Sequence, residues 1–166
     1  MHFTPEQKAT IKAYVLADPV LLPMTSGPTT DYGFIANTLA AYASPVVLAW
    51  VNNVSPSVVD DAPDYSTFDS IAAGKRDSWG FFLRSSRDFA RNKTRKWITD
   101  IWGATLVTPT TLNSDAILLS GTENARVIEV VLGGTTKTTG AVSAMARNYV
   151  GSIDLLEIAA IFNVQA

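Results

Sequence analysis

Few residues of this chain could carry out covalent or metal chemistry. None of its 166 residues is cysteine, and its one histidine, His2, stands next to the first residue. The sequence therefore offers no thiolate nucleophile, no zinc site built on cysteine, and almost nothing for histidine-based acid–base catalysis. Asp60, Asp61 and Asp64 are close enough along the chain to form a catalytic pair or bind a metal. Carboxylates in an acidic loop that contains proline are, however, usually just solvated.

Sequence motifs of enzymes are missing as well. The pattern G-x-S-x-G of a serine nucleophile does not occur, and Gly133-Gly134 lacks the lysine and the spacing of a phosphate-binding loop. The glycine pair is explained more simply as the end of a helix. We therefore predict that the protein is not an enzyme and has no catalytic, cofactor-binding or metal-binding residues.

The main electrostatic feature is a basic segment in the middle of the sequence. Residues 75–97 contain eight basic side chains against two acids, whereas residues 1–74 and 98–166 each carry an excess of acids. We predict that the eight bases form an interface: Lys75, Arg76, Arg84, Arg87, Arg91, Lys93, Arg95 and Lys96. The aromatic anchors are expected to be Trp79, Trp97 and Trp102, mostly buried in the core or at a subunit contact.

Three interpretations of the basic segment stay open. Aromatic side chains such as Phe81 and Phe89 alternate with the bases, so the segment could face phosphates of a nucleic acid. Alternatively, the aromatics belong to the core and the charges form a solvated helical face. In the third interpretation, the bases of one subunit meet the acidic flanks of the next. The net charge of −2 argues against DNA as the main partner, because DNA-binding domains are usually basic.

Helix signals cover most of the chain, with two strands. A Thr-Pro-Glu-Gln start predicts a capped first helix, and Asp154 with Glu157 predicts a capped last one. A short β-branched run and a later alternating stretch predict strands at residues 46–51 and 142–150, which should pair. The remaining expectations are helices over residues 31–42, 70–84, 94–102, 114–119 and 122–132 (the last with a strand as alternative), and loops over 104–113 and 135–140.

These elements predict a mainly helical fold of the α+β class. We expect one helical domain over residues 1–166, with a small two-stranded β element formed by residues 46–51 and 142–150. Charged residues make up 17% of the chain, below the roughly 25% of ordinary soluble domains. Much of the polar surface must therefore be Thr, Ser and Asn. Removing these side chains from water in an interface costs little free energy compared with charged side chains. No stretch is long and apolar enough for a membrane span, and the first residues lack the pattern of a secretion signal.

The order of these segments resembles a family of small virion or virion-assembly proteins of tailed bacteriophages, which have no named activity. The matching parts are residues 4–18, 43–50, 74–79, 93–103, 124–134 and 141–162. They include a Gly-Lys-Arg-x-x-Trp helix and an Asn-Ala-Arg-x-x-Glu helix closed by Gly-Gly. The resemblance implies a head–tail connector, neck or tail-associated protein present in several copies, and it supplies no catalytic residues.

The expected function is therefore structural. The protein should be a subunit of the virion, made in the host cytoplasm, whose partners are copies of itself and neighbouring virion proteins. Neither a membrane nor a small-molecule substrate is expected as a partner. The alternative is a small phage protein that contacts DNA through residues 75–96.

Overall fold

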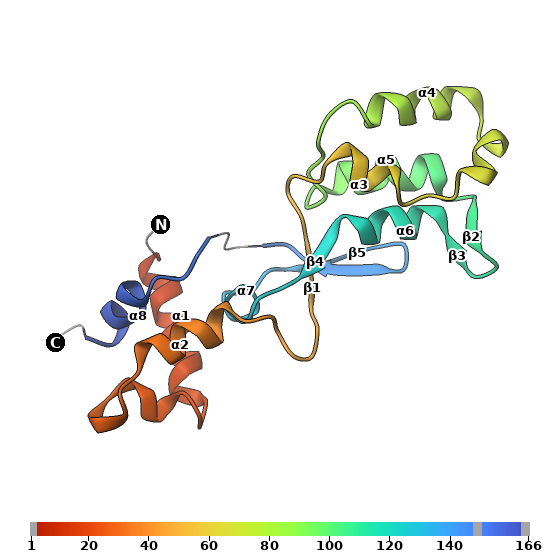
Figure 1. The fold of residues 1–166 in the computed structure, drawn as a ribbon. Helices are drawn as coiled ribbons and strands as arrows, with labels where there is room; N and C mark the ends of the chain where they lie inside the picture. The colour runs from red at the N-terminus through yellow and green to blue at the C-terminus, as the bar shows by residue number, and fades with distance from the viewer. Residues whose placement is uncertain (1–2, 148–150, 164–166) are drawn as a thin grey trace. The chain divides into compact units, whose positions relative to one another are not determined.

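The computed structural model describes residues 3–147 and 151–163 (Figure 1). The chain divides into two compact units. The terminal unit is formed by Met1–Val47, Asn124–Gly134 and Arg147–Ala166, and the central unit by Leu48–Glu123 and Thr135–Ala146. The chain enters and leaves the central unit twice, so neither unit is a continuous stretch of sequence. That residues 1–166 behave as one domain stays a prediction.

The terminal unit is helical. Its helices are α1 (Pro5–Ala17), α2 (Tyr32–Ala40), α7 (Val127–Val131) and α8 (Leu155–Phe162), with short 3₁₀ turns at Leu22–Thr25 and Gly27–Thr29. Thr4 and Gln7 form the predicted capping box, since each side chain bonds the backbone N–H of the other residue. The core is mainly aliphatic, and its fully buried side chains include Ile11, Val15, Ile35, Leu39, Ile128 and Ile158.

The central unit combines helices with a sheet. Its helices are α3 (Pro56–Asp60), α4 (Ala73–Phe82), α5 (Asn92–Trp102) and α6 (Asn113–Ser120), with a 3₁₀ helix at Tyr65–Ser70. Four strands form a mixed sheet in the order β4-β1-β6-β5. They are β1 (Leu48–Trp50), β4 (Thr122–Asn124), β5 (Thr136–Thr139) and β6 (Val142–Met145). A separate hairpin consists of β2 (Leu106–Thr108) and β3 (Thr111–Leu112).

The predicted pairing of the two strands is confirmed. β1 runs parallel to β6, and Ala49 faces Met145 in the register. The two strands pair because a lone strand would leave its backbone polar groups unsatisfied. Their pairing joins the first half of the chain to its last third. Residues 148–150, which the sequence assigns to the second strand, lie outside the described residues.

The predicted fold class, a helical domain with a small two-stranded element, is wrong because it understates the sheet. β5 was expected to be a loop, but it is an antiparallel edge strand on β6. Its residues are polar, so they show no hydrophobic alternation, and threonine is favoured in strands through its branched Cβ. Gly140 has a positive φ of 59° and begins the two-residue turn between β5 and β6, a local hairpin signal.

Two other segments also differ from the predicted secondary structure. Residues 104–113 were expected to be a loop, but they form the β2–β3 hairpin, where the Thr108 hydroxyl accepts from the backbone N–H of Thr111 at 3.1 Å. The helix expected from residue 122 is wrong in its first half, since Thr122–Asn124 is β4 and only Val127–Val131 is helical. Strand formation there depends on the distant β1, which a local pattern does not contain.

The core of the central unit is aromatic. Trp79 and Trp102 are fully buried and cross edge to face, with their ring centroids 5.3 Å apart. Trp79 also stacks on Phe82 at 5.3 Å. The prediction of buried tryptophans is thus confirmed for Trp79 and Trp102, whereas Trp97 is half-buried. Trp97 lies at the edge of this core, where it can contact a partner.

Candidate interaction surface

The eight predicted interface bases do not form one continuous charged face. Three are engaged with neighbouring acids: Arg76 with Asp69 at 3.0 Å, Arg91 with Asp88 at 2.9 Å and Lys96 with Asp100 at 2.7 Å. These pairs are largely exposed, so each contributes only about 0–1 kcal/mol. Their charges are nevertheless balanced within the same molecule.

Two further bases hold the structure together. Arg95 is 2% exposed and therefore belongs to the interior. Arg87 is half-buried and caps the end of α4, because it donates to the carbonyls of Phe82 at 2.7 Å and Phe81 at 2.9 Å. Its guanidinium also lies over the ring of Trp97, 5.3 Å from the centroid. Neither side chain is available as a simple surface contact.

Lys75, Arg84 and Lys93 remain as exposed bases. No carboxylate lies within 4.0 Å of them in the described part of the chain. Arg84 lies over the ring of Phe81, 5.4 Å from its centroid. These three are the bases of the segment whose charge is free to act on a partner.

Many acids of the two flanks belong to the same unit as the basic segment. The central unit holds nine bases (Lys75, Arg76, Arg84, Arg87, Arg91, Lys93, Arg95, Lys96 and Lys137) and nine acids (Asp60, Asp61, Asp64, Asp69, Asp77, Asp88, Asp100, Asp115 and Glu123). The unit is therefore neutral as a whole. Seven of the thirteen acids of the two flanks, four of them before the basic segment, lie in the same unit as the bases, which weakens the hypothesis that they pair with a neighbouring copy.

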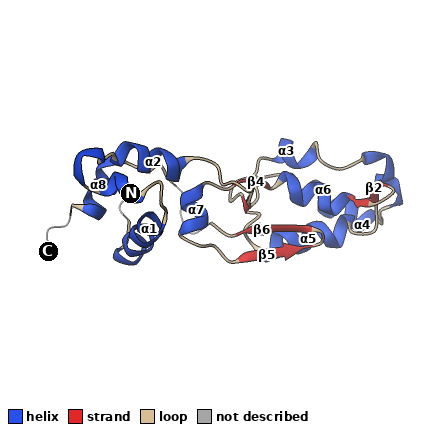
Figure 2. Cartoon of the chain, turned by 90° about the horizontal axis from the view of Figure 1, so that it is seen from below, coloured by secondary structure: helices blue, strands red, loops and turns tan. Residues whose placement is uncertain are grey.

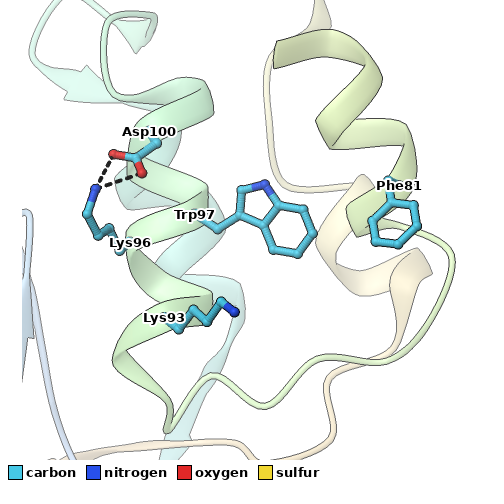
Figure 3. A pocket seen from close by; sticks show the side chains of 5 residues that line it. All are labelled: Phe81, Lys93, Lys96, Trp97 and Asp100. Atoms are coloured by element: carbon cyan, nitrogen blue, oxygen red, sulfur yellow. Dashed lines mark hydrogen bonds and ion pairs between the residues drawn. The ribbon is translucent and has the colours of Figure 1, made fainter. Parts of the chain in front are cut away.

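The aromatic groove is the most distinctive surface of the central unit. It is a hollow of about 550 Å³ lined by Phe81, Lys93, Lys96, Trp97 and Asp100 (Figure 3). The indole of Trp97 projects from α5 toward α4, which carries Phe81 (Figure 3). The two rings are tilted, with centroids 6.1 Å apart, and Phe81 is 55% exposed. Such an exposed aromatic ring is a suitable contact for a partner protein, because binding would remove its apolar surface from water.

The helical period of α5 explains the lining. Lys93, Lys96, Trp97 and Asp100 recur at intervals of three and four residues, which places them along one face of the helix. The rings of Trp97 and Phe82 meet edge to face with their centroids 5.1 Å apart, and this contact holds the indole against the core. Together with the cap formed by Arg87, this packing fixes the groove without a ligand.

The acidic loop has structural tasks. The Tyr65 hydroxyl donates to Asp60 and accepts from Trp79 Nε1 at 2.8 Å. Burial, followed by the bond to Asp60, raises the pKa of Tyr65 to about 12. Asp64 accepts from the N–H of Ser66 at 2.9 Å, and this bond lowers the pKa of Asp64. Within the described residues, no three His, Cys, Asp or Glu side chains gather as a metal site.

Comparison with known proteins gives no family assignment, because no protein-family model, curated protein or solved structure matches the chain. None of the helices in the described ranges is long and apolar enough to cross a membrane. One contributor to the aromatic groove was missed from sequence, because Phe81 was noted among the aromatics but not as an anchor.

Proposed function

We propose that this protein is a structural subunit of a tailed-bacteriophage virion, in the head–tail connector, neck or tail region. It works by packing against copies of itself and neighbouring virion proteins. The resemblance of its ordered segments to small virion proteins supports this role. The observation that carries the proposal is the aromatic groove, in which the exposed Phe81 and the half-buried Trp97 lie beside Arg84 and Lys93, two cations without an acidic partner among the described residues.

The groove contains one residue type of an interface hot spot, the tryptophan Trp97, and Arg84 lies over the neighbouring ring of Phe81. Tryptophan and arginine are enriched among the residues that dominate binding energy, and such residues lie where a partner can exclude water. An apolar or aromatic side chain of a neighbouring subunit would cover Phe81 and Trp97. Arg84 and Lys93 would then orient an acidic partner surface and speed association more than they strengthen it.

Replacement of Phe81 tests this function. Phe81→Ala should weaken self-association of the purified protein at least about tenfold, which corresponds to roughly 1.4 kcal/mol or more. Sedimentation equilibrium would measure the association constant. Phe34→Ala is the matched control, because Phe34 is 41% exposed on α2 of the terminal unit and should leave association unchanged.

Two results would contradict the proposal. One is equal self-association of the wild type and the Phe81→Ala variant. The other is a wild-type protein that stays monomeric and is absent from purified virions when these are analysed by mass spectrometry.

The alternative function is DNA contact through residues 75–96, favoured by the three bases without acidic partners. It predicts micromolar binding to a DNA duplex, measured by fluorescence anisotropy, that weakens steeply between about 50 and 200 mM salt. Replacing Lys75, Arg84 and Lys93 by Glu should abolish such binding. Arg95 is left out of this variant because its side chain is buried. Salt-dependent binding lost in the triple variant, with self-association unchanged in Phe81→Ala, would put this function first.

A further inference from the structure

A second hollow of the central unit has a different chemistry. It measures about 540 Å³ and is lined mainly by polar side chains: Ala90, Asn92, Arg95, Thr136, Lys137 and Thr138. The first turn of α5 supplies one wall, and the edge strand β5 supplies the other. In Figure 2, α5 lies beside the β5–β6 hairpin, in agreement with the 3.0 Å hydrogen bond between Arg95 and Thr139.

Arg95 is a buried cation without an anionic partner. Its Nη1 donates to the carbonyls of Phe89 at 2.6 Å and Ala90 at 2.7 Å, and its Nε donates to the Thr139 hydroxyl at 3.0 Å. All three acceptors are neutral. Buried charges in proteins are usually paired with an opposite charge, because an unpaired one costs several kcal/mol. No carboxylate lies within ion-pair distance of Arg95 among the residues described.

The remaining guanidinium nitrogen can donate into the hollow. Nε and Nη1 are occupied, which leaves Nη2 without an acceptor in the described part of the chain. The guanidinium plane is held over the indole of Trp50, 4.8 Å from the ring centroid, so its direction is fixed. Burial lowers the pKa of Arg95 and the charge of Asp88 opposes this effect, but an arginine stays protonated.

Lys137 adds a second positive charge from the opposite wall. Side chains two residues apart in a strand point to the same face, so Lys137 shares the face of Thr139, which contacts Arg95. The strand is fixed at this position because the carbonyl of Lys137 accepts from Trp50 Nε1 at 3.2 Å. The Lys137 side chain is exposed and has no ion pair with any described residue.

The start of α5 contributes in the same direction. The N-cap residue Arg91 makes no side-chain cap, so the first N–H groups of the helix lack that partner, and the helix dipole is positive there. The acid whose charge acts on Arg95 is Asp88, whose oxygens accept from Ala90 N and Arg91 Nε, both at 2.9 Å. Asp88 is thus already committed, and a net positive field remains over the hollow.

We propose that this hollow is an oxyanion site that binds a single phosphate group. Arg95 Nη2 and Lys137 Nζ provide the charge, and the amide of Asn92 provides a further hydrogen bond. Donors from a strand, a helix start and a buried guanidinium approach from different sides, which suits the tetrahedral oxygens of phosphate better than a planar carboxylate. The phosphate is either free in solution or part of a nucleic-acid backbone. This site is independent of the proposed virion role.

Isothermal titration calorimetry of the full chain with inorganic phosphate, at constant ionic strength, tests the site. The wild type should bind one phosphate, and Lys137→Gln should weaken this binding about tenfold or more, since a charge-assisted contact is lost. Lys93→Gln is the control, because Lys93 lines the aromatic groove instead and should not change phosphate affinity. Arg95→Lys keeps the positive charge but removes the planar guanidinium group with its several N–H donors, and should also weaken phosphate binding. Lys137 is exposed, so its variant keeps the test valid even if Arg95→Lys fails to fold.

Further titrations identify the source and define failure. Binding of a short DNA duplex that weakens in Lys137→Gln but not in Lys93→Gln would assign the phosphate to nucleic acid, whereas phosphate binding without duplex binding would assign it to a free anion. The proposal is overturned if the wild type shows no phosphate binding. It is equally overturned if Lys137→Gln binds phosphate as well as the wild type does, or if acetate binds with the same affinity as phosphate.

Discussion

A single methyl group at Gly121 should destabilise the central unit. A Cβ built on this residue would lie 1.8 Å from Cδ1 of Phe89, far inside the 3.0 Å below which a neighbouring atom has to move. Phe89 cannot move easily. Its ring is fully buried, and its N–H donates to the carbonyl of Val51, whose own N–H donates to Gly121, both at 3.0 Å. The ring and the glycine are thus held by the same residue of the chain.

The sign of the effect follows from two opposing magnitudes. Gly→Ala substitutions often stabilise by about 0.4–1 kcal/mol, because alanine restricts the unfolded chain. Overpacking a core costs about 1–3 kcal/mol, and the overlap here places Gly121→Ala at the upper end of that range. We therefore expect a net loss of about 2 kcal/mol. Gly80→Ala is the matched control, since a Cβ there meets nothing within 4 Å and the residue lies inside α4. This variant should gain up to about 1 kcal/mol.

Urea unfolding followed by tryptophan fluorescence is the suitable assay. All four tryptophans lie in the central unit, so the signal reports on the unit that contains Gly121. With a slope of about 1–3 kcal/mol per molar urea, the midpoint of Gly121→Ala should fall by roughly 1 M. A Gly121→Ala variant with the wild-type midpoint or a higher one would refute the reasoning. So would a Gly80→Ala variant that loses as much stability.

Two other outcomes can be measured on the same protein. If residues 1–166 unfold as the predicted single domain, fluorescence from the central unit and far-UV circular dichroism from both units should give coincident urea transitions; separate midpoints would contradict this. In an absorbance titration at high pH, one tyrosine should ionise late, near pH 12, and Tyr65→Phe should remove that step. Because the folded pKa of Tyr65 is raised above the unfolded value near 10, its contribution to stability is complete below pH 10 and should be lost between about pH 10 and 12. Equal ionisation of all tyrosines near pH 10 would contradict this assignment.

Local signals predicted local structure well. The Thr4 capping box, the stop at Gly103 and the cap at Asp154 are all interactions within a few residues, and the structure contains each of them. The strand predicted over residues 46–51 is present as β1, although only Leu48–Trp50 form it.

Features without hydrophobic alternation or with distant partners were missed. β5 consists of Thr136–Thr139 and pairs with β6 across a two-residue turn, but its polar residues show no alternation that predicts a strand. The burial of Arg95 likewise depends on Trp50 and Thr139, both more than forty positions away in sequence. A signal for Arg95 did exist. Together with Ile98 and Trp102 it recurs at intervals of three and four residues, on the apolar face of α5.

The helical period of α5 therefore places on different faces the bases that the charge count adds together. Lys93 and Lys96 lie on the face with Trp97 and line the aromatic groove, whereas Arg95 lies on the face that contacts β5. Successive residues of a helix are about 100° apart, so a basic run of this length cannot present all its charges to one partner. The central unit balances its charges internally. The basic segment can therefore attract a partner only where single cations lack a counter-charge. Two such places are the rim around Phe81 and the hollow at Arg95, and substitutions at Phe81 and at Lys137 should affect them separately.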